Sequence, residues 1–187
     1  MRTIPLALCV LFGIGAYADA QDGIRVLATS KTSTMEKEMN EAAEAGFRFA
    51  GVMGGDTAVG GSEVVVIMTP STESTQGYHY KLLATSKTST MQTEMQEAGD
   101  AGYDYRGQTV FKSTFGGKEV VAIVERDKSV GAPERYQYRL LATKKTSTMQ
   151  KELAEAVAAG FRFVGLTVAS TAVGGTELVT ILRRPAE

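Results

Sequence analysis

The chain of 187 residues has one cysteine, one histidine and no tryptophan. Cys9 lies in an N-terminal apolar segment, so the rest of the chain has no thiol for a disulfide, a nucleophile or a metal site. The single histidine, His79, excludes a histidine metal cluster and excludes a Ser-His-Asp triad in each copy of a repeat. The formal net charge of −1 gives no overall attraction to nucleic acid or to anionic lipid. We therefore expect no metal, no cofactor and no nucleic-acid partner.

Residues 1–20 have the features of a cleaved secretory signal peptide. Arg2 gives a basic start, and the apolar run over 4–15 is too short to span a bilayer. Small residues at Ala18 and Ala20 suit a cleavage site. No other stretch reaches transmembrane length, so we expect a periplasmic or secreted protein without a membrane span in the mature chain.

Three copies of one unit fill the remaining sequence. Residues 24–69 align without a gap with 80–125 and with 138–183. Each copy contains the word Leu-Ala-Thr-x-Lys-Thr-Ser-Thr-Met, which begins at Leu27, Leu83 and Leu141. The repeat organises the chain before any local signal does. We divide it into repeat 1 over 21–77, repeat 2 over 78–134 and repeat 3 over 135–187, with linkers over 70–77 and about 127–134.

Each unit begins with alternating apolar residues, as in Tyr136, Tyr138 and Leu140, which predict a half-buried strand. A helix follows over about 34–45, 90–101 and 148–159. We interpret the patterns at its start as capping boxes: Ser33-x-x-Glu36, Ser89-x-x-Gln92 and Ser147-x-x-Gln150. The helix should end at a glycine that can adopt a left-handed conformation: Gly46, Gly102 and Gly160.

Two more strands complete the unit. The second strand starts with the aromatic pairs at 47–49, 103–105 and 161–163, and a glycine-containing turn leads to the third strand. A helix crossover makes the first two strands parallel, and the hairpin makes the third antiparallel to the second. The third strand can lie at the edge or between the other two. We predict an α+β fold of three β-α-β-β repeats, about nine strands and three helices, pseudo-threefold and sharing a sheet or a core.

The words Ala-Gly-Phe-Arg-Phe at 45–49 and 159–163, and Ala-Gly-Tyr-Asp-Tyr at 101–105, carry a resemblance. They resemble the helix-end segment of small bacterial β-α-β-β domains of unknown function. This resemblance covers each repeat and implies a fold and a bacterial source, but no activity. The order of elements is also similar to that of the flavin-binding dodecins, although no binding residue can be matched, so no cofactor is implied.

The Lys-Thr-Ser-Thr word is the first candidate site. A helix N-terminus offers free N–H groups and a positive dipole end, which suit an anion. The candidate ligand-binding residues are Lys31, Ser33, Thr34, Lys87, Ser89, Thr90, Lys145, Ser147 and Thr148. The ligand would be an anionic small molecule or an envelope glycan. The alternative is that the serines only cap the helices and that the lysines are solvated or paired with carboxylates.

Carboxylates and aromatic residues are the other candidates. Glutamates recur on the helix and at the start of the third strand, the latter at Glu63, Glu119 and Glu177. Paired carboxylates can hydrolyse glycosides, but structural ion pairs with lysine or arginine are the favoured interpretation. The aromatic pairs can stack sugars or pack in the core, and we expect the tyrosine pairs to be more exposed than the phenylalanine pairs. We expect His79 to be a surface strand residue.

The sequence thus favours a non-enzymatic repeat protein with a binding or structural role, without catalytic residues. Two alternatives stay open. One is a cell-envelope hydrolase that uses a pair of glutamates. The other is a homo-oligomeric assembly protein that pairs exposed sheet edges.

Overall fold

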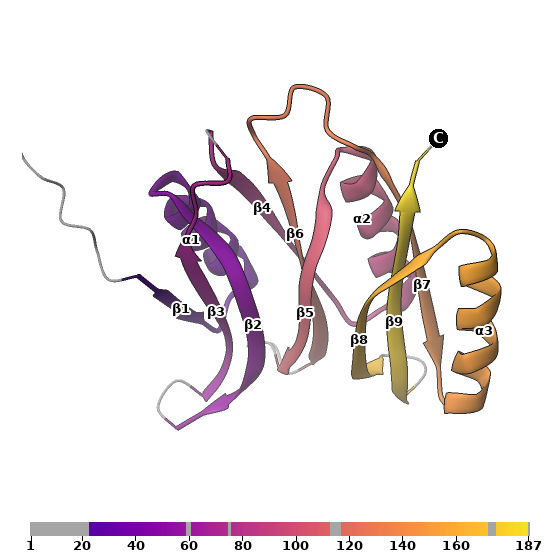
Figure 1. Ribbon diagram of the computed structural model, residues 1–187. Coiled ribbons are helices and arrows are strands. Elements are labelled where there is room, and N and C mark those ends of the chain that lie inside the picture. Colours follow the sequence, from indigo (N-terminus) through magenta and orange to yellow (C-terminus); the bar gives the residue numbers. More distant parts are fainter. Residues whose placement is uncertain (1–22, 59–60, 75, 113–116, 172–174, 187) are drawn as a thin grey trace, which may run out of the picture.

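The computed structural model describes residues 23–58, 61–74, 76–112, 117–171 and 175–186, which form three similar units (Figure 1). Unit 1 contains β1 (Arg25–Thr29), α1 (Thr32–Glu44), β2 (Phe47–Thr57) and β3 (Gly61–Pro70). Unit 2 contains β4 (Tyr78–Thr85), α2 (Thr88–Asp100), β5 (Asp104–Lys112) and β6 (Lys118–Asp127). Unit 3 contains β7 (Tyr136–Thr143), α3 (Thr146–Ala158), β8 (Arg162–Thr171) and β9 (Gly175–Pro185). The α+β fold of three β-α-β-β repeats is confirmed.

The third strand of each unit lies in the centre of a three-stranded sheet. The strand orders are β1-β3-β2, β4-β6-β5 and β7-β9-β8. Every pairing is antiparallel, so the first two strands of a unit flank the third and run parallel to each other. The sequence allows the third strand to lie either at the edge or in the centre of the sheet, and the structure shows that it lies in the centre. The first strand of each unit is therefore an edge strand.

The capping-box interpretation is wrong. The helices begin at Thr32, Thr88 and Thr146, about two residues earlier than expected, and none has a side-chain hydrogen bond at its N-cap. The N-cap residues are lysines with an extended backbone, for example Lys31 with φ −124°. The hydroxyl of Thr29 accepts a hydrogen bond from the Lys31 N–H at 3.2 Å, which turns the chain into the helix.

The glycine ends of the helices are confirmed. Gly46, Gly102 and Gly160 have φ of 86°, 78° and 83°, a region where an L side chain is strained. In α2 the Tyr103 N–H donates to Ala98 O at 2.9 Å, and in α3 the Phe161 N–H donates to Ala156 O at 3.0 Å. These bonds satisfy carbonyls that the last helical turn leaves free.

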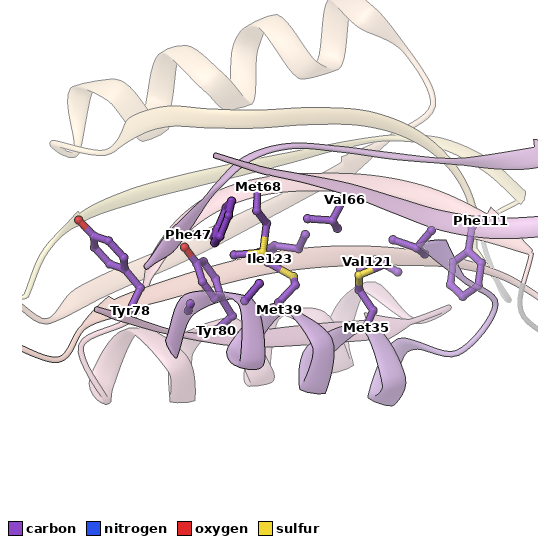
Figure 2. Close-up of a cluster of buried hydrophobic side chains, with 13 residues drawn as sticks. Met35, Met39, Phe47, Val66, Met68, Tyr78, Tyr80, Phe111, Val121 and Ile123 are labelled. Carbon is purple, nitrogen blue, oxygen red and sulfur yellow. The ribbon is translucent and has the colours of Figure 1, made fainter. Parts of the chain in front are cut away.

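The units follow one another in a row, and α1 and α2 each pack between their own sheet and the next one, while α3 lies at the end of the row (Figure 1). Figure 2 shows Met35 and Met39 of α1 pointing into a cluster that includes Val66 of unit 1 and Ile123 of unit 2. A second cluster joins α2 to unit 3 in the same way. The expected shared core is therefore found between neighbouring units, while the three sheets stay separate.

Polar side chains of α1 and α2 also bind the edge strand of the next unit. The Asn40 side chain accepts from the Tyr80 N–H at 2.9 Å and donates to Tyr80 O at 3.0 Å. Glu36 accepts from the Leu82 N–H at 2.8 Å. In this way α1 supplies β4 with the backbone partners that a neighbouring strand would provide. The hydrogen bond to the Leu82 N–H also explains why the Glu36 carboxylate does not act in a capping box.

The same contact recurs between α2 and β7. Gln96 accepts from the Tyr138 N–H at 3.0 Å, and Gln92 accepts from the Leu140 N–H at 2.7 Å. Gln92 and Gln96 stand at the positions that Glu36 and Asn40 occupy in unit 1. The two boundaries between units are therefore built alike.

Candidate functional site

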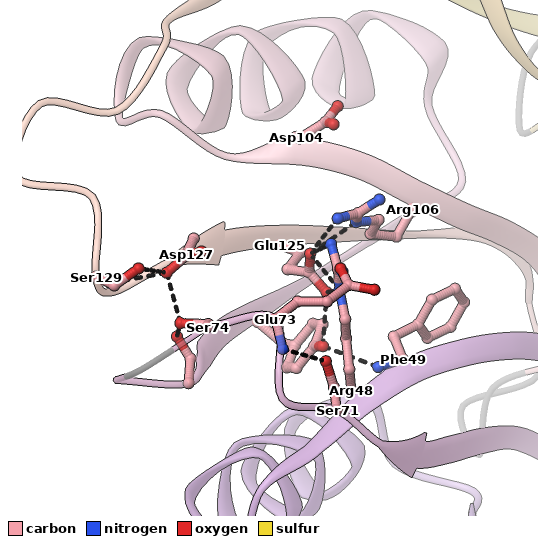
Figure 3. A network of polar contacts seen from close by, with 12 residues as sticks. Arg48, Phe49, Ser71, Glu73, Ser74, Asp104, Arg106, Glu125, Asp127 and Ser129 are labelled. Carbon is pink, nitrogen blue, oxygen red and sulfur yellow. Dashed lines mark hydrogen bonds and ion pairs between the residues drawn. The ribbon is translucent and has the colours of Figure 1, made fainter.

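A half-open cavity of about 270 Å³ lies beside the boundary of units 1 and 2. Charged residues from several strands line it, among them Arg48 of β2, Asp104 and Arg106 of β5, and Glu125 of β6. Figure 3 shows Arg48 and Arg106 gathered around Glu125, while Asp104 lies apart from them on β5. Because it collects most of the buried charge that the structure describes, this polar groove is the candidate functional site.

Glu125 is the centre of the groove and is only 3% exposed. The Arg48 guanidinium donates to its Oε1 at 2.8 Å, and Arg106 Nε donates to the same oxygen at 2.8 Å. The Tyr80 hydroxyl donates to Oε2 at 2.7 Å. Burying a carboxylate is costly unless charged and polar partners surround it, and Glu125 has three of them.

A β-bulge gives Arg106 its direction. The pairing of β5 with β6 shifts between Tyr105 and Gly107, so Arg106 is the extra residue of the bulged strand. The other units have the same bulge between Phe49 and Gly51 and between Phe163 and Gly165. Only the middle unit places a charged side chain there.

The boundary between units 2 and 3 carries the same ion pair with its charges reversed. Arg48 of unit 1 pairs with Glu125 of unit 2. Asp104 stands at the position equivalent to Arg48, and Arg183 stands at the position equivalent to Glu125; these two form an ion pair as well. Asp104 and Arg183 are in ionic contact without the orientation of a hydrogen bond.

Burial shifts several proton equilibria in and near the groove. It raises the pKa of the Asp104 carboxyl, and the neighbouring Arg183 and Arg106 offset this only in part. It also raises the pKa of the Tyr105 phenol to about 12 and the pKa of the Tyr80 phenol further. For Arg48, burial works to lower the pKa, but the bond and the charge of Glu125 raise it above its ordinary value.

The predicted anion-binding residues lie at the starts of three separate helices and do not form one pocket. The side chains of Lys31, Lys87 and Lys145 are exposed, and most of the neighbouring serines and threonines are exposed too. A cavity beside Lys87 has a volume of only about 10 Å³. That volume is about the minimum for one water molecule and cannot enclose a phosphate.

The expectation for the aromatic pairs is wrong in part. Tyr80 and Tyr138 are 0% and 4% exposed, whereas Phe163 is 55% exposed. The tyrosine hydroxyls can be buried because they find partners; the Tyr138 hydroxyl, for example, donates to Tyr103 O at 3.1 Å. His79 is half-buried, and its Nδ1 lies 2.9 Å from the Tyr103 hydroxyl.

Sequence reasoning missed the charged groove, although a signal for it exists. Aligned by repeat, one column reads Arg48, Asp104 and Arg162, and another reads Thr69, Glu125 and Arg183. A reversal of charge in both columns indicates paired positions on neighbouring units. The glutamates predicted at the start of the third strand, Glu63, Glu119 and Glu177, are half-buried at or near the starts of these strands.

Within the described ranges no group of three or more His, Cys, Asp or Glu residues could hold a metal ion. None of the helices there is long and apolar enough to cross a membrane. Comparisons with protein-family models, with curated proteins and with solved structures found no match.

Proposed function

We propose that the protein is a secreted or periplasmic, non-enzymatic repeat protein with a structural or binding role. The observation that carries the proposal is the use of its buried charge. Glu125 is bonded to Arg48 of the preceding unit, and Asp104 is paired with Arg183 of the following one. Charged groups used in this way hold units together and leave little for chemistry on a substrate.

The binding role would belong to the helix N-termini. All three helices lack a side-chain cap, and each has a lysine as its N-cap residue. Their first N–H groups and the nearby lysine charge favour an anion. We place a phosphate or a carboxylate-bearing envelope glycan there, bound weakly at each of the three sites.

A thermal-shift screen of the mature protein against phosphate, acidic glycans and flavins tests this role. A stabilising shift that disappears in the Lys31→Ala/Lys87→Ala/Lys145→Ala variant supports anion binding. A matched control is Lys37→Ala/Lys151→Ala, which removes exposed lysines beyond the first turn from two of the three helices, α1 and α3. If no anion produces a shift, the binding role is wrong and the structural role remains.

The groove supplies the one observation that favours hydrolysis instead. Asp104 and Glu125 are opposite each other on β5 and β6, and the pKa of Asp104 is raised by burial. Two carboxyls with different environments can serve as acid and base. Against this stand the hydrogen bonds of Glu125 to two arginines and to Tyr80, and the ion pair of Asp104 with Arg183. Release of reducing ends from an envelope polysaccharide, abolished by Asp104→Asn, would overturn the non-enzymatic proposal.

A further inference from the structure

At both boundaries between units, an aromatic side chain covers a glycine of the next unit. A methyl group added to Gly107 would lie 3.0 Å from Cζ of Phe49. One added to Gly165 would lie 2.3 Å from the hydroxyl oxygen of Tyr105. Phe49 and Tyr105 are equivalent positions, and so are Gly107 and Gly165. The contact is thus a repeated feature of how units dock.

At each end of the row, one of the two partners of this contact has no counterpart in the part of the chain that the structure describes: the aromatic side chain at unit 3 and the glycine at unit 1. Phe163 of unit 3 stands at the position of Phe49 and Tyr105, and it is 55% exposed. Gly51 of unit 1 stands at the position of Gly107 and Gly165, and a methyl group there would meet nothing within 4 Å. Among the described residues, the row of units therefore has an exposed aromatic side chain at the unit 3 end and an open glycine at the unit 1 end.

Exposed apolar residues share the outer faces with Phe163 and Gly51. On the outer face of unit 1, Ile24, Val26 and Met53 are 60%, 64% and 58% exposed. On the outer face of unit 3, Leu166 and Val168 are 50% and 58% exposed. The residue equivalent to Ile24 in unit 2 is Tyr80, which is covered by the preceding helix and is 0% exposed.

The side chains of the two end faces also differ in size from those at the internal boundaries, and a larger residue on one face is matched by a smaller residue on the other. Val157 of α3 replaces the small residues Ala43 and Gly99 of the other helices, and it is 57% exposed. The internal boundary has no room for that bulk, because a methyl group on Gly99 would lie 2.3 Å from Tyr136 O. On the outer face of unit 1, Ile24 takes the position of the larger Tyr80. This smaller side chain would leave space for Val157 of α3 from a second chain.

One of the two polar helix contacts is preserved. Gln150 stands at the position of Gln92, which binds the Leu140 N–H, whereas Ala154 replaces the residue equivalent to Asn40 and Gln96. A contact between unit 3 and unit 1 of a second chain would therefore keep the apolar packing and one of the two helix residues whose side-chain amide hydrogen-bonds the edge strand. We expect it to be weaker than the internal boundaries and to form reversibly.

We propose that the outer face of unit 3 docks onto the outer face of unit 1 of a second copy of this chain. The docking is head to tail, so it joins unlike faces and produces either an open filament or a closed ring. It continues between molecules the row of units that exists within one molecule. The inference rests on the proposed structural role and gives that role a partner.

Sedimentation velocity and light scattering over a range of concentrations test the docking in the full chain and in a chain that starts at Gln21. We expect mass to increase with concentration in the shorter chain. If only that chain associates, residues 1–20 compete for the face. If both chains stay monomeric at every concentration, the inference is overturned.

Two variants separate the two faces. Phe163→Ser/Leu166→Ser removes the docking side chains, and Gly51→Leu fills the opposing site, where an added Cβ would meet nothing within 4 Å. Each should raise the dissociation constant by at least about tenfold, since aromatic anchors dominate interfaces. Matched controls are Val130→Ser and Gly131→Leu, which make similar changes in the linker before unit 3. Those controls should associate like the unmodified chain.

Mixing the two variants gives the decisive result. The Gly51→Leu chain keeps an intact unit 3 face, and the Phe163→Ser/Leu166→Ser chain keeps an intact unit 1 face. An equimolar mixture should form a one-to-one dimer and nothing larger. Association that survives in either variant alone, or a mixture that stays monomeric while the unmodified chain associates, contradicts head-to-tail docking. A monomeric chain leaves the non-enzymatic proposal standing, because that proposal depends on the polysaccharide and ligand assays.

Discussion

Glu94 of α2 lowers the stability of the fold, because part of its carboxylate is buried without a hydrogen-bond partner. Its Oε2 is buried and has no hydrogen-bond partner among the described residues. Burial, and then the charge of Glu97, raise the pKa of this carboxyl. An acid with a raised pKa holds its proton more tightly in the folded state than in the unfolded state. Its ionised form therefore destabilises the fold, and stability falls as pH rises from the ordinary value through the raised one.

Glu94→Gln should raise the melting temperature at pH 7 by about 1–2 °C, because the amide removes the buried charge. The gain should vanish at acidic pH, where Glu94 of the unmodified protein is protonated and neutral. Calorimetric scans from pH 3 to pH 8, a range chosen around the carboxyl value of about 4.3, measure both effects. Glu152→Gln, at the equivalent position of α3, has no such buried orphan oxygen and is the control. Equal gains at both positions would contradict the explanation.

Single residues also show why the site was not predicted. The strand of Glu125 reads as an apolar segment, Val-Val-Ala-Ile-Val, with a glutamate at its end. Such an end residue is usually solvated, and nothing in its own repeat explains its burial. Its partner Arg48 lies in another unit, and only an alignment of the copies with attention to charge reveals the pair.

At the scale of the elements, signals confined to one unit were reliable and signals that cross a boundary were not. The glycines at 46, 102 and 160 end their helices as expected, because a left-handed residue is a local requirement. The motif Ser33-x-x-Glu36 fits a capping box equally well, yet Glu36 binds the Leu82 N–H of the next unit. A sequence pattern cannot distinguish these two partners of one carboxylate.

The bulged strands provide a graded test of the boundaries. Alanine at Gly165 should cost about 1–3 kcal/mol, because the added methyl group overlaps the Tyr105 ring. Gly107→Ala should cost less, since Phe49 and Val52 lie 3.0 and 3.2 Å from the added carbon and need to move only slightly. Gly51→Ala should be neutral or slightly stabilising, because the site is open and glycine is entropically costly in a strand.

Urea unfolding of the three variants at low protein concentration, where end-to-end association is negligible, gives the order. The three substitutions are chemically identical and occupy equivalent positions, so each is a control for the others. An equal loss of stability in all three would mean that the cost comes from the strand backbone and not from the neighbouring unit.

In the whole molecule, stability resides in the boundaries more than in the units. One buried cluster joins units 1 and 2 and includes Met39, Val66 and Ile123. Another joins units 2 and 3 and includes Met95, Val124 and Ile181. The cluster within unit 3 has three buried residues among those described, Leu141, Ala156 and Leu182. Neighbouring units of a repeat protein stabilise one another in this way.

This arrangement predicts how fragments of the chain behave. A fragment of residues 21–134 keeps the whole first cluster and should fold with reduced stability, because the removal of unit 3 uncovers Met91 and Met95 of α2. A fragment of residues 77–187 keeps the second cluster and should fold too, but it exposes Tyr80 and Ile123. Residues 135–187 alone bury too little apolar surface to offset the loss of chain entropy, so they should be unfolded. Circular dichroism with urea titration separates these outcomes. Cooperative unfolding of the isolated third unit would show that each unit has its own core and that the boundaries only align them.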